Sequence, residues 1–246
     1  MSVFGLCEAG RDPSLMFANS APAPRQAVWR EGEAVRLVKG AWRAGYHGLA
    51  ACLAVAWDSQ LSPVDARRLK AGQFRRDPLG AWFEVARAKT GRRALATLSR
   101  RSERVLHAYL GSLGAEPAGF APIFRNRSGQ PYSKDTLGDD FRVVRALLFG
   151  SGETRQMADF RRTGSAEALA GGAKPESLST KMANTLSSSN RLHKTYGPVM
   201  LASVREVDEA RKVGRSKLRE QTEDESVTAP ARKVSRIASR STKPLK

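Results

Sequence analysis

Cysteine, long apolar runs and acidic residues are all scarce in this sequence of 246 residues. Its two cysteines, Cys7 and Cys52, are too few and too far apart for a disulfide framework or a cysteine-rich zinc site. The longest apolar run, Leu49 to Trp57, is about half as long as a membrane span. Residues 1–24 lack the basic-then-apolar order of a secretory signal. We therefore expect a cytoplasmic protein with no membrane contact.

Basic residues far outnumber acidic ones. The chain holds 42 Lys and Arg against 24 Asp and Glu, a formal charge of +18. Basic side chains displace condensed counterions from nucleic acid, so a polyanion is the favoured partner. Hydrophobic residues make up 41% of the chain, which is enough for a core and excludes a wholly disordered basic protein.

Hydrophobic periodicity predicts helices in the first part of the chain. A three-and-four spacing of apolar residues begins at Trp29, and the run from Leu49 to Trp57 predicts a second, buried helix. Ser62 followed by Pro63 is typical of an N-cap and first helical position, which predicts a short helix to about Leu69.

The period then changes to that of short strands. Residues 72–74, 82–88 and 94–98 predict three strands, with turn sequences at 77–80 and 89–92. Further helices are expected from residue 99, then at 135–148, 154–171, 175–184, 188–195 and 199–218. The expected fold class is α+β, mostly helical, with one small antiparallel three-stranded sheet.

Composition divides the chain into four parts. Residues 1–27 hold three prolines and no sustained period, which predicts a flexible arm. Residues 28–200 form the expected main domain, and residues 201–225 a charged helix. Residues 226–246 contain six basic residues and no acidic ones, which predicts a disordered basic tail.

Four stretches in a fixed order carry a resemblance to a known family. They are Ala56–Asp65 (AWDSQLSPVD), Ala88–Arg92 (AKTGR), Asp159–Thr163 (DFRRT) and Leu192–Tyr196 (LHKTY). Their order and spacing resemble the catalytic domain of the tyrosine recombinases, the phage integrase family, over about residues 29–199. The first stretch falls at the family's first arginine box, the second at its lysine turn, the third at its second arginine box and the last at its tyrosine helix.

The resemblance implies an integrase-like catalytic domain acting on double-stranded DNA in a bacterial or phage setting, in DNA integration or recombination. A tyrosine would attack the scissile phosphate and form a 3′-phosphotyrosyl bond, with no metal and no nucleotide cofactor. The family's N-terminal core-binding domain is expected to be missing. The segment after Val199 is expected to dock on a neighbouring subunit, and so to support self-association on DNA.

Carried over residue by residue, the resemblance assigns catalytic roles to Tyr196 as nucleophile, Arg161 as phosphate clamp and Lys89 as proton donor. Basic residues near these positions are the expected DNA contacts: Arg67, Arg92, Arg93 and Arg162. A guanidinium suits a phosphate because it can bond two of its oxygens at once. Each residue also has a simpler reading, as a packed tyrosine, a solvated basic face or a turn lysine.

The sequence departs from the family pattern at three positions. Ser62 stands where the first arginine is expected, and Ala158 stands where the histidine three residues before Arg161 is expected. Asn184 is the nearest match to the histidine or tryptophan that usually precedes the tyrosine helix, and an amide cannot act as an acid. The predicted active site is therefore degenerate. Arg67 lies five residues after Ser62, about 140° around a helix, so it is not a simple replacement for the first arginine, and Arg67 or Arg68 would have to reach the phosphate from another angle.

Three functions follow from these observations. The first is a recombinase that cuts and rejoins DNA through Tyr196. The second is a relative that binds DNA without cutting it, as a regulator or accessory subunit. The third is an unrelated basic protein that packages RNA or DNA, for which the tail from Ser226 is the main binding element.

Overall fold

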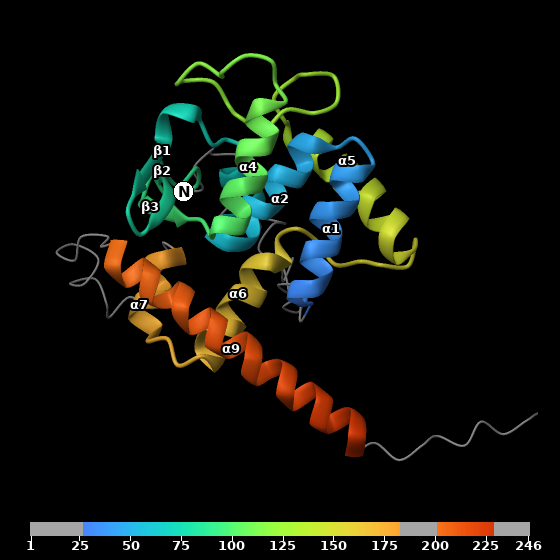
Figure 1. The fold of residues 1–246 in the computed structure, drawn as a ribbon, viewed down its shortest axis with the longest axis vertical. Coiled ribbons are helices and arrows are strands. Elements are labelled where there is room, and N and C mark those ends of the chain that lie inside the picture. The colour runs from blue at the N-terminus through green and yellow to red at the C-terminus, as the bar shows by residue number, and fades with distance from the viewer. Residues whose placement is uncertain (1–26, 183–200, 229–246) are drawn as a thin grey trace, which may run out of the picture.

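The computed structural model describes residues 27–182 and 201–228 of the chain (Figure 1). Several predictions fall outside these residues: the nucleophile Tyr196, the candidate Asn184, the helix at 188–195, the arm before residue 27 and the tail after residue 228. Within the described residues, the architecture is mostly helical with one three-stranded antiparallel sheet, as expected.

Helix α2 (His47–Ser59) forms the centre of the domain. Its residues from Leu49 to Trp57 are all buried, because the segment is apolar on every side. Helices α1 (Glu31–Arg43), α4 (Arg100–Gly111), α5 (Lys134–Phe149) and α6 (Asp159–Ala170) all contact α2. The predicted buried helix is therefore confirmed, and these four helices pack against it.

The short helix α3 (Pro63–Ala66) begins as the sequence predicts. Ser62 is its N-cap, and the hydroxyl of Ser62 accepts a hydrogen bond from the backbone N–H of Asp65 at 3.3 Å. Proline occupies the first helical position, where no N–H is needed. This cap lies within the segment Ala56–Asp65, which resembles the first arginine box.

The sheet has the order β1-β2-β3, with both pairs antiparallel. Strands β2 (Gly80–Ala86) and β3 (Arg93–Thr97) lie where the sequence predicts them. The first strand was predicted at 72–74, which is wrong: β1 spans Phe74–Asp77. Gly72 lies instead in a 3-10 turn, where a Cβ would approach the carbonyl oxygen of Gly119 to 2.8 Å. This glycine allows two backbones to meet rather than starting a strand.

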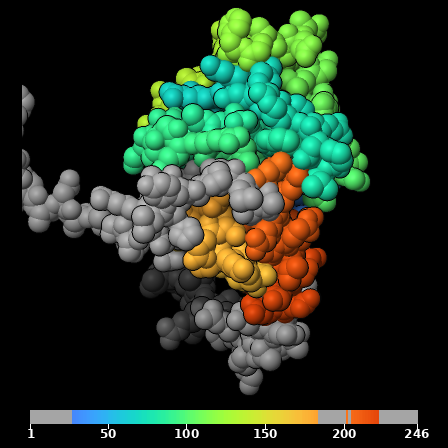
Figure 2. Space-filling view, turned by 90° about the vertical axis from the view of Figure 1, so that its left-hand side faces the viewer, coloured from blue at the N-terminus to red at the C-terminus, as the bar shows by residue number. Residues whose placement is uncertain are grey.

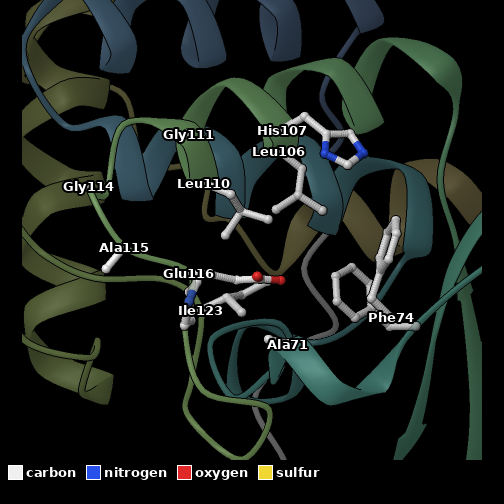
Figure 3. A pocket seen from close by; sticks show the side chains of 12 residues that line it. Ala71, Phe74, Leu106, His107, Leu110, Gly111, Gly114, Ala115, Glu116 and Ile123 are labelled. Atoms are coloured by element: carbon white, nitrogen blue, oxygen red, sulfur yellow. The ribbon is translucent and has the colours of Figure 1, made fainter.

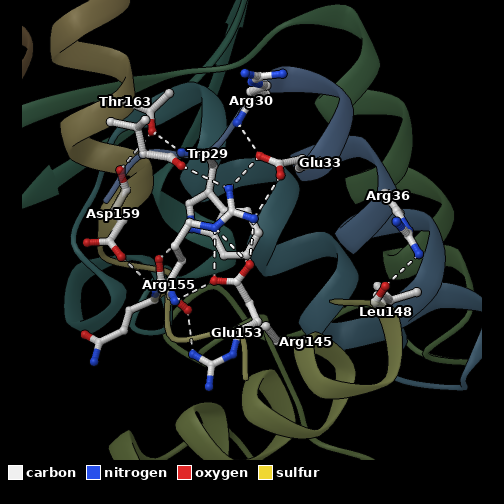
Figure 4. Close-up of polar contacts among 12 residues, drawn as sticks. Trp29, Arg30, Glu33, Arg36, Arg145, Leu148, Glu153, Arg155, Asp159 and Thr163 are labelled. Carbon is white, nitrogen blue, oxygen red and sulfur yellow. Dashed lines mark hydrogen bonds and ion pairs between the residues drawn. The ribbon is translucent and has the colours of Figure 1, made fainter. Parts of the chain in front are cut away.

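The predicted helix at 154–171 begins later, at Asp159. The preceding residues form a loop around Arg155, whose guanidinium lies 4.0 Å from the ring centre of Trp29. The same group pairs with Glu33 and Glu153, at 2.7 Å each (Figure 4). These contacts to distant residues hold residues 153–155 outside the helix.

Helices α7 (Pro175–Met182) and α9 (Leu201–Thr228) lie together on one side of the sheet and against α6 (Figures 1 and 2). A small second core joins them, built from Ala168, Ala173, Leu178, Met182 and Val207. The described part of α9 thus packs on its own chain. None of the helices in the described ranges is long and apolar enough to cross a membrane.

Buried ion pairs fasten α9. Lys181, with a fully buried side chain, donates to Asp208 at 2.5 Å and to the hydroxyl of Thr97 at 2.9 Å. Arg211 is also buried and pairs with Glu167 at 3.0 Å. Farther along the helix, Arg215 reaches Glu31 at 3.2 Å. Charged residues of α9 are therefore bound to β3, α6, α7 and α1.

Candidate functional site

Arg161 lies in the first turn of α6, at the predicted second arginine box. Its Nη1 donates to the carbonyl oxygen of Gln60 at 2.8 Å, and its Nη2 donates to the carbonyl oxygen of Met182 at 2.6 Å. The first contact joins α6 to Gln60, two residues before the Ser62 cap. The second joins it to the end of α7. Arg161 is thus directed to where three segments far apart in the sequence meet.

A second arginine, Arg87, reaches the same place from the end of β2. Its Nη1 donates to the Met182 carbonyl oxygen at 2.7 Å. Its Nε pairs with Asp65 Oδ2 at 2.7 Å, and the two side chains are only 14% and 5% exposed. Two guanidinium groups therefore converge on one backbone carbonyl, with one carboxylate beside them.

The carboxylate of Asp65 ties α3 to the hairpin between β2 and β3. Its Oδ1 accepts the backbone N–H of Ala88 at 2.8 Å, and its Oδ2 accepts the hydroxyl of Ser62 at 2.5 Å. With the ion pair to Arg87, this one side chain has three partners. Asp65 therefore fixes the base of the hairpin that carries Lys89.

The electrostatics of Arg161 reflect its surroundings. Burial and, to a smaller extent, the nearby charge of Arg87 lower the pKa of Arg161 to about 10, while Asp65 acts in the opposite direction. At neutral pH Arg161 therefore remains charged. The arginine cluster, which we define as Arg87, Arg161 and Asp65, holds two positive charges and one negative.

The predicted hairpin residues lie just beyond the cluster. The backbone N–H of Arg87 donates to the carbonyl of Arg92 at 2.8 Å and closes the turn, and Gly91 has φ +64°, which glycine adopts without strain. Lys89 is exposed in this turn and one residue from the Ala88–Asp65 bond. Arg93 is also exposed and pairs with Glu84 at 2.8 Å.

The remaining predicted basic residues lie apart from the cluster's hydrogen bonds. Arg67 turns to the other side of α3 and donates to the carbonyl oxygen of Tyr132 at 3.0 Å. Arg162 follows Arg161 on α6 and is half-buried. Ala158, at the expected histidine position, is the N-cap residue of α6 and offers only a methyl group.

Sequence reasoning gave no role to Arg87 or Asp65, although one signal was present. Residues 81, 83 and 85 of β2 are buried and the residues between them are less so. Period two makes Arg87 the next inward position. A basic residue at an inward position requires a buried partner, and Asp65 is that partner.

A cavity of about 550 Å³ lies elsewhere, between the sheet and α4 (Figure 3). Its lining is mainly apolar and includes Phe74, Leu106, Leu110 and Ile123, with His107 at its edge. None of the cluster residues lines it. Within the described ranges, no group of three His, Cys, Asp or Glu side chains is placed to hold a metal ion.

No protein-family model and no curated protein matches the sequence. Similarity is found among solved structures. The crystal structure of XerA recombinase matches over 80% of this chain and 67% of its own, with a TM-score of 0.54 and 15% identity. At that identity, the likeness concerns the fold.

Two structures of XerH site-specific recombinase bound to difH substrate, a post-cleavage and a pre-cleavage complex, also match at 12% identity. Their TM-scores are 0.49 and 0.46, with 85% and 82% of this chain covered. This chain covers about half of each XerH chain, 55% and 52%. The helices and the small sheet of the described residues, together with the XerA match, give a fold like that of a recombinase catalytic domain.

Proposed function

We propose that this protein is a DNA-binding recombinase of the tyrosine type, which cuts and rejoins double-stranded DNA. In the proposed step, the phenolic oxygen of Tyr196 loses its proton to solvent, attacks the scissile phosphorus and forms a phosphotyrosyl bond. The bond to the 5′ oxygen breaks, and that oxygen takes a proton from Lys89. Attack by a 5′ hydroxyl on the phosphotyrosyl bond reverses the step, so no bond energy is lost.

Arg161 would bind the non-bridging oxygens of the phosphate. The negative charge on these oxygens redistributes as the phosphorus gains a fifth ligand, and a fixed cation stabilises that state most. Two N–H groups of Arg161 are already directed at oxygen acceptors. A guanidinium held in this way needs little reorganisation when a phosphate oxygen replaces a carbonyl.

The observation that best supports the proposal is the convergence around Arg161. The second arginine box, the first box at Gln60 and the root of the Lys89 hairpin all meet at the end of α7. These are three of the four stretches that carry the resemblance. The fold likeness to XerA recombinase is independent support.

Covalent trapping tests the proposal. Duplexes that the protein retains would first be selected from a random pool, and nicked versions would then be incubated with protein and analysed under denaturing conditions. We expect a protein–DNA adduct that is absent in Tyr196→Phe. Arg161→Gln should slow adduct formation about 10²–10³-fold. Arg142→Gln removes the same charge from an exposed site on α5 and should leave the rate unchanged.

The second candidate, DNA binding without cleavage, is favoured by Ser62 and Ala158, which lack the cation and the imidazole expected at those positions. It predicts a retained duplex and no adduct from any nicked substrate. Absence of duplex binding at low salt would contradict both candidates.

A further inference from the structure

The acceptor shared by Arg87 and Arg161 is weak for two cations. Both guanidinium groups donate to the carbonyl oxygen of Met182, at 2.7 and 2.6 Å. A carbonyl oxygen is neutral, whereas guanidinium groups make their strongest hydrogen bonds to carboxylate and phosphate oxygens. The geometry of this pair therefore suits an oxyanion better than the carbonyl it now holds.

Asp65 positions the guanidinium of Arg87 and leaves one of its N–H groups free to donate to another acceptor. The carboxylate bonds Nε of Arg87, while Nη1 of the same guanidinium is directed at Met182. Two nitrogens of Arg161 donate to the carbonyl oxygens of Gln60 and Met182. The two arginines thus direct N–H groups at the Met182 carbonyl from two places, the end of β2 and the first turn of α6.

Position 62 explains why a second cation comes from the hairpin. A serine here caps α3 and donates its hydroxyl to Asp65. It has no charge, so the cation that stands beside the Asp65 carboxylate is the guanidinium of Arg87. Within the described residues, neither Arg67 nor Arg68, the nearest basic residues in the sequence, contacts this carboxylate. Arg67 donates instead to the carbonyl oxygen of Tyr132.

We propose that Arg87 and Arg161 together form a binding site for a single phosphodiester group, in which Arg87 supplies the cation that Ser62 lacks. Phosphate oxygens would replace the Met182 carbonyl as acceptors of both guanidinium groups. Asp65 acts as a positioning residue that holds Arg87. This inference rests on the proposed function for its DNA context, but its ligand chemistry is separately measurable.

The first test uses dimethyl phosphate, a phosphodiester monoanion, and follows the arginine Nε–H signals by NMR at constant ionic strength. In the wild-type chain, the signals of Arg87 and Arg161 should shift together. In Arg87→Gln, the Arg161 shift should need about tenfold more ligand, because one charge-assisted contact is lost. An Arg161 response that is identical in both proteins, or no response in the wild type, would overturn the inference.

The second test uses the covalent adduct described above. Arg87→Gln should slow adduct formation as much as Arg161→Gln does, Arg87→Lys should recover part of the rate, and Arg142→Gln should match the wild type. Thermal unfolding of each variant identifies loss of fold, and Asp65→Asn with Arg87→Gln removes both members of the ion pair if the single variant is unstable. A folded Arg87 variant with the wild-type rate would overturn the inference.

The two tests separate this inference from the proposed function. Dimethyl phosphate binding that depends on Arg87, without any adduct, would support the anion site and contradict cleavage. Adducts that form independently of Arg87 would support cleavage and contradict the role of Arg87.

Discussion

Arg155 connects the start of the domain to the loop before α6. Its guanidinium covers the ring of Trp29 and pairs with two carboxylates, Glu33 and Glu153. Hydrogen bonds from Arg155 lower the pKa of Glu153 to about 2. For Glu33, burial alone would raise the pKa, but the hydrogen bonds and charges of Arg155 and Arg30 together outweigh it and the pKa is lowered. Both carboxylates are therefore harder to protonate in the folded chain.

This arrangement predicts a loss of stability in acid. Because the folded pKa values lie below the ordinary value of 4.5, the unfolded chain binds more protons, and the free energy of unfolding falls from about pH 4.5 towards pH 2. Arg155→Met should lower stability at neutral pH and flatten this acid slope. Urea unfolding followed by tryptophan fluorescence across this range measures both. An unchanged slope in Arg155→Met would contradict the assignment.

Gly164 on α6 leaves room for the side chain of Gln60. A Cβ at this glycine would lie 1.8 Å from Gln60 Nε2, and Gln60 is fully buried with φ 57°. Gly164→Ala should therefore destabilise the chain by about 1–3 kcal/mol. In a Gln60→Gly background the same change should cost little, because the obstacle is gone and glycine accepts this φ. A double-mutant cycle by urea unfolding measures the coupling, and additive costs would refute it.

At the candidate site, the sequence indicated single residues but not their partners. Arg161 and Lys89 could be proposed from local motifs, and the serine at position 62 was recognisable as a departure. The ion pair between Arg87 and Asp65 joins residues on different elements, so no local spacing contains it. The alternation of buried residues along β2 was the one local signal for Arg87. The resemblance to the family depends on motif positions, so it does not draw on that alternation.

At the scale of elements, α6 and α9 approach so closely that backbones touch at glycines. A Cβ at Gly214 would lie 1.9 Å from the carbonyl oxygen of Glu167, and one at Gly171 would lie 1.7 Å from that of Ala210. Both obstacles are backbone atoms, which cannot rotate away as a side chain can. The small residues therefore set the distance between the two helices.

Gly214→Ala should force α9 away from α6 and destabilise the chain by about 1–3 kcal/mol. Val213→Ala is a matched control, because Val213 is 51% exposed and its change should stay within about 0.5 kcal/mol. Urea unfolding gives the energies, and the rate of trypsin cleavage within α9 reports local detachment. Equal stability of the two variants would show that the helices tolerate a wider spacing.

Elements with strong local signals were predicted well. The all-round apolar pattern of α2, the Ser62–Pro63 start of α3 and the strands β2 and β3 all depend on nearby residues. The errors at β1 and at the start of α6 have a common cause. In both places, contacts with distant residues, Gly119 for Gly72 and Glu33 for Arg155, override the local pattern.

At the scale of the whole molecule, the basic residues behind the charge of +18 lie in regions that we expect to affect DNA binding differently. Residues 229–246 contain all six basic residues of the predicted tail. Removing them should weaken duplex binding and reduce the slope of log affinity against log salt by at most about 5. Anisotropy of a labelled duplex in a salt series measures this. Binding should persist, and its complete loss would favour a packaging protein whose tail is the binding element.

The buried contacts of α9 also have a consequence for how the protein is made. Arg211 donates to the carbonyl oxygens of Trp57 and Asp58, and Arg215 pairs with Glu31. A ribosome synthesises those early partners long before it adds the two arginines. Domains fold as units once their sequence is available, so this one completes its core only after the ribosome has added Arg211 and Arg215. A premature stop before residue 211 would therefore leave the buried carboxylate of Glu167 without both of its arginine partners.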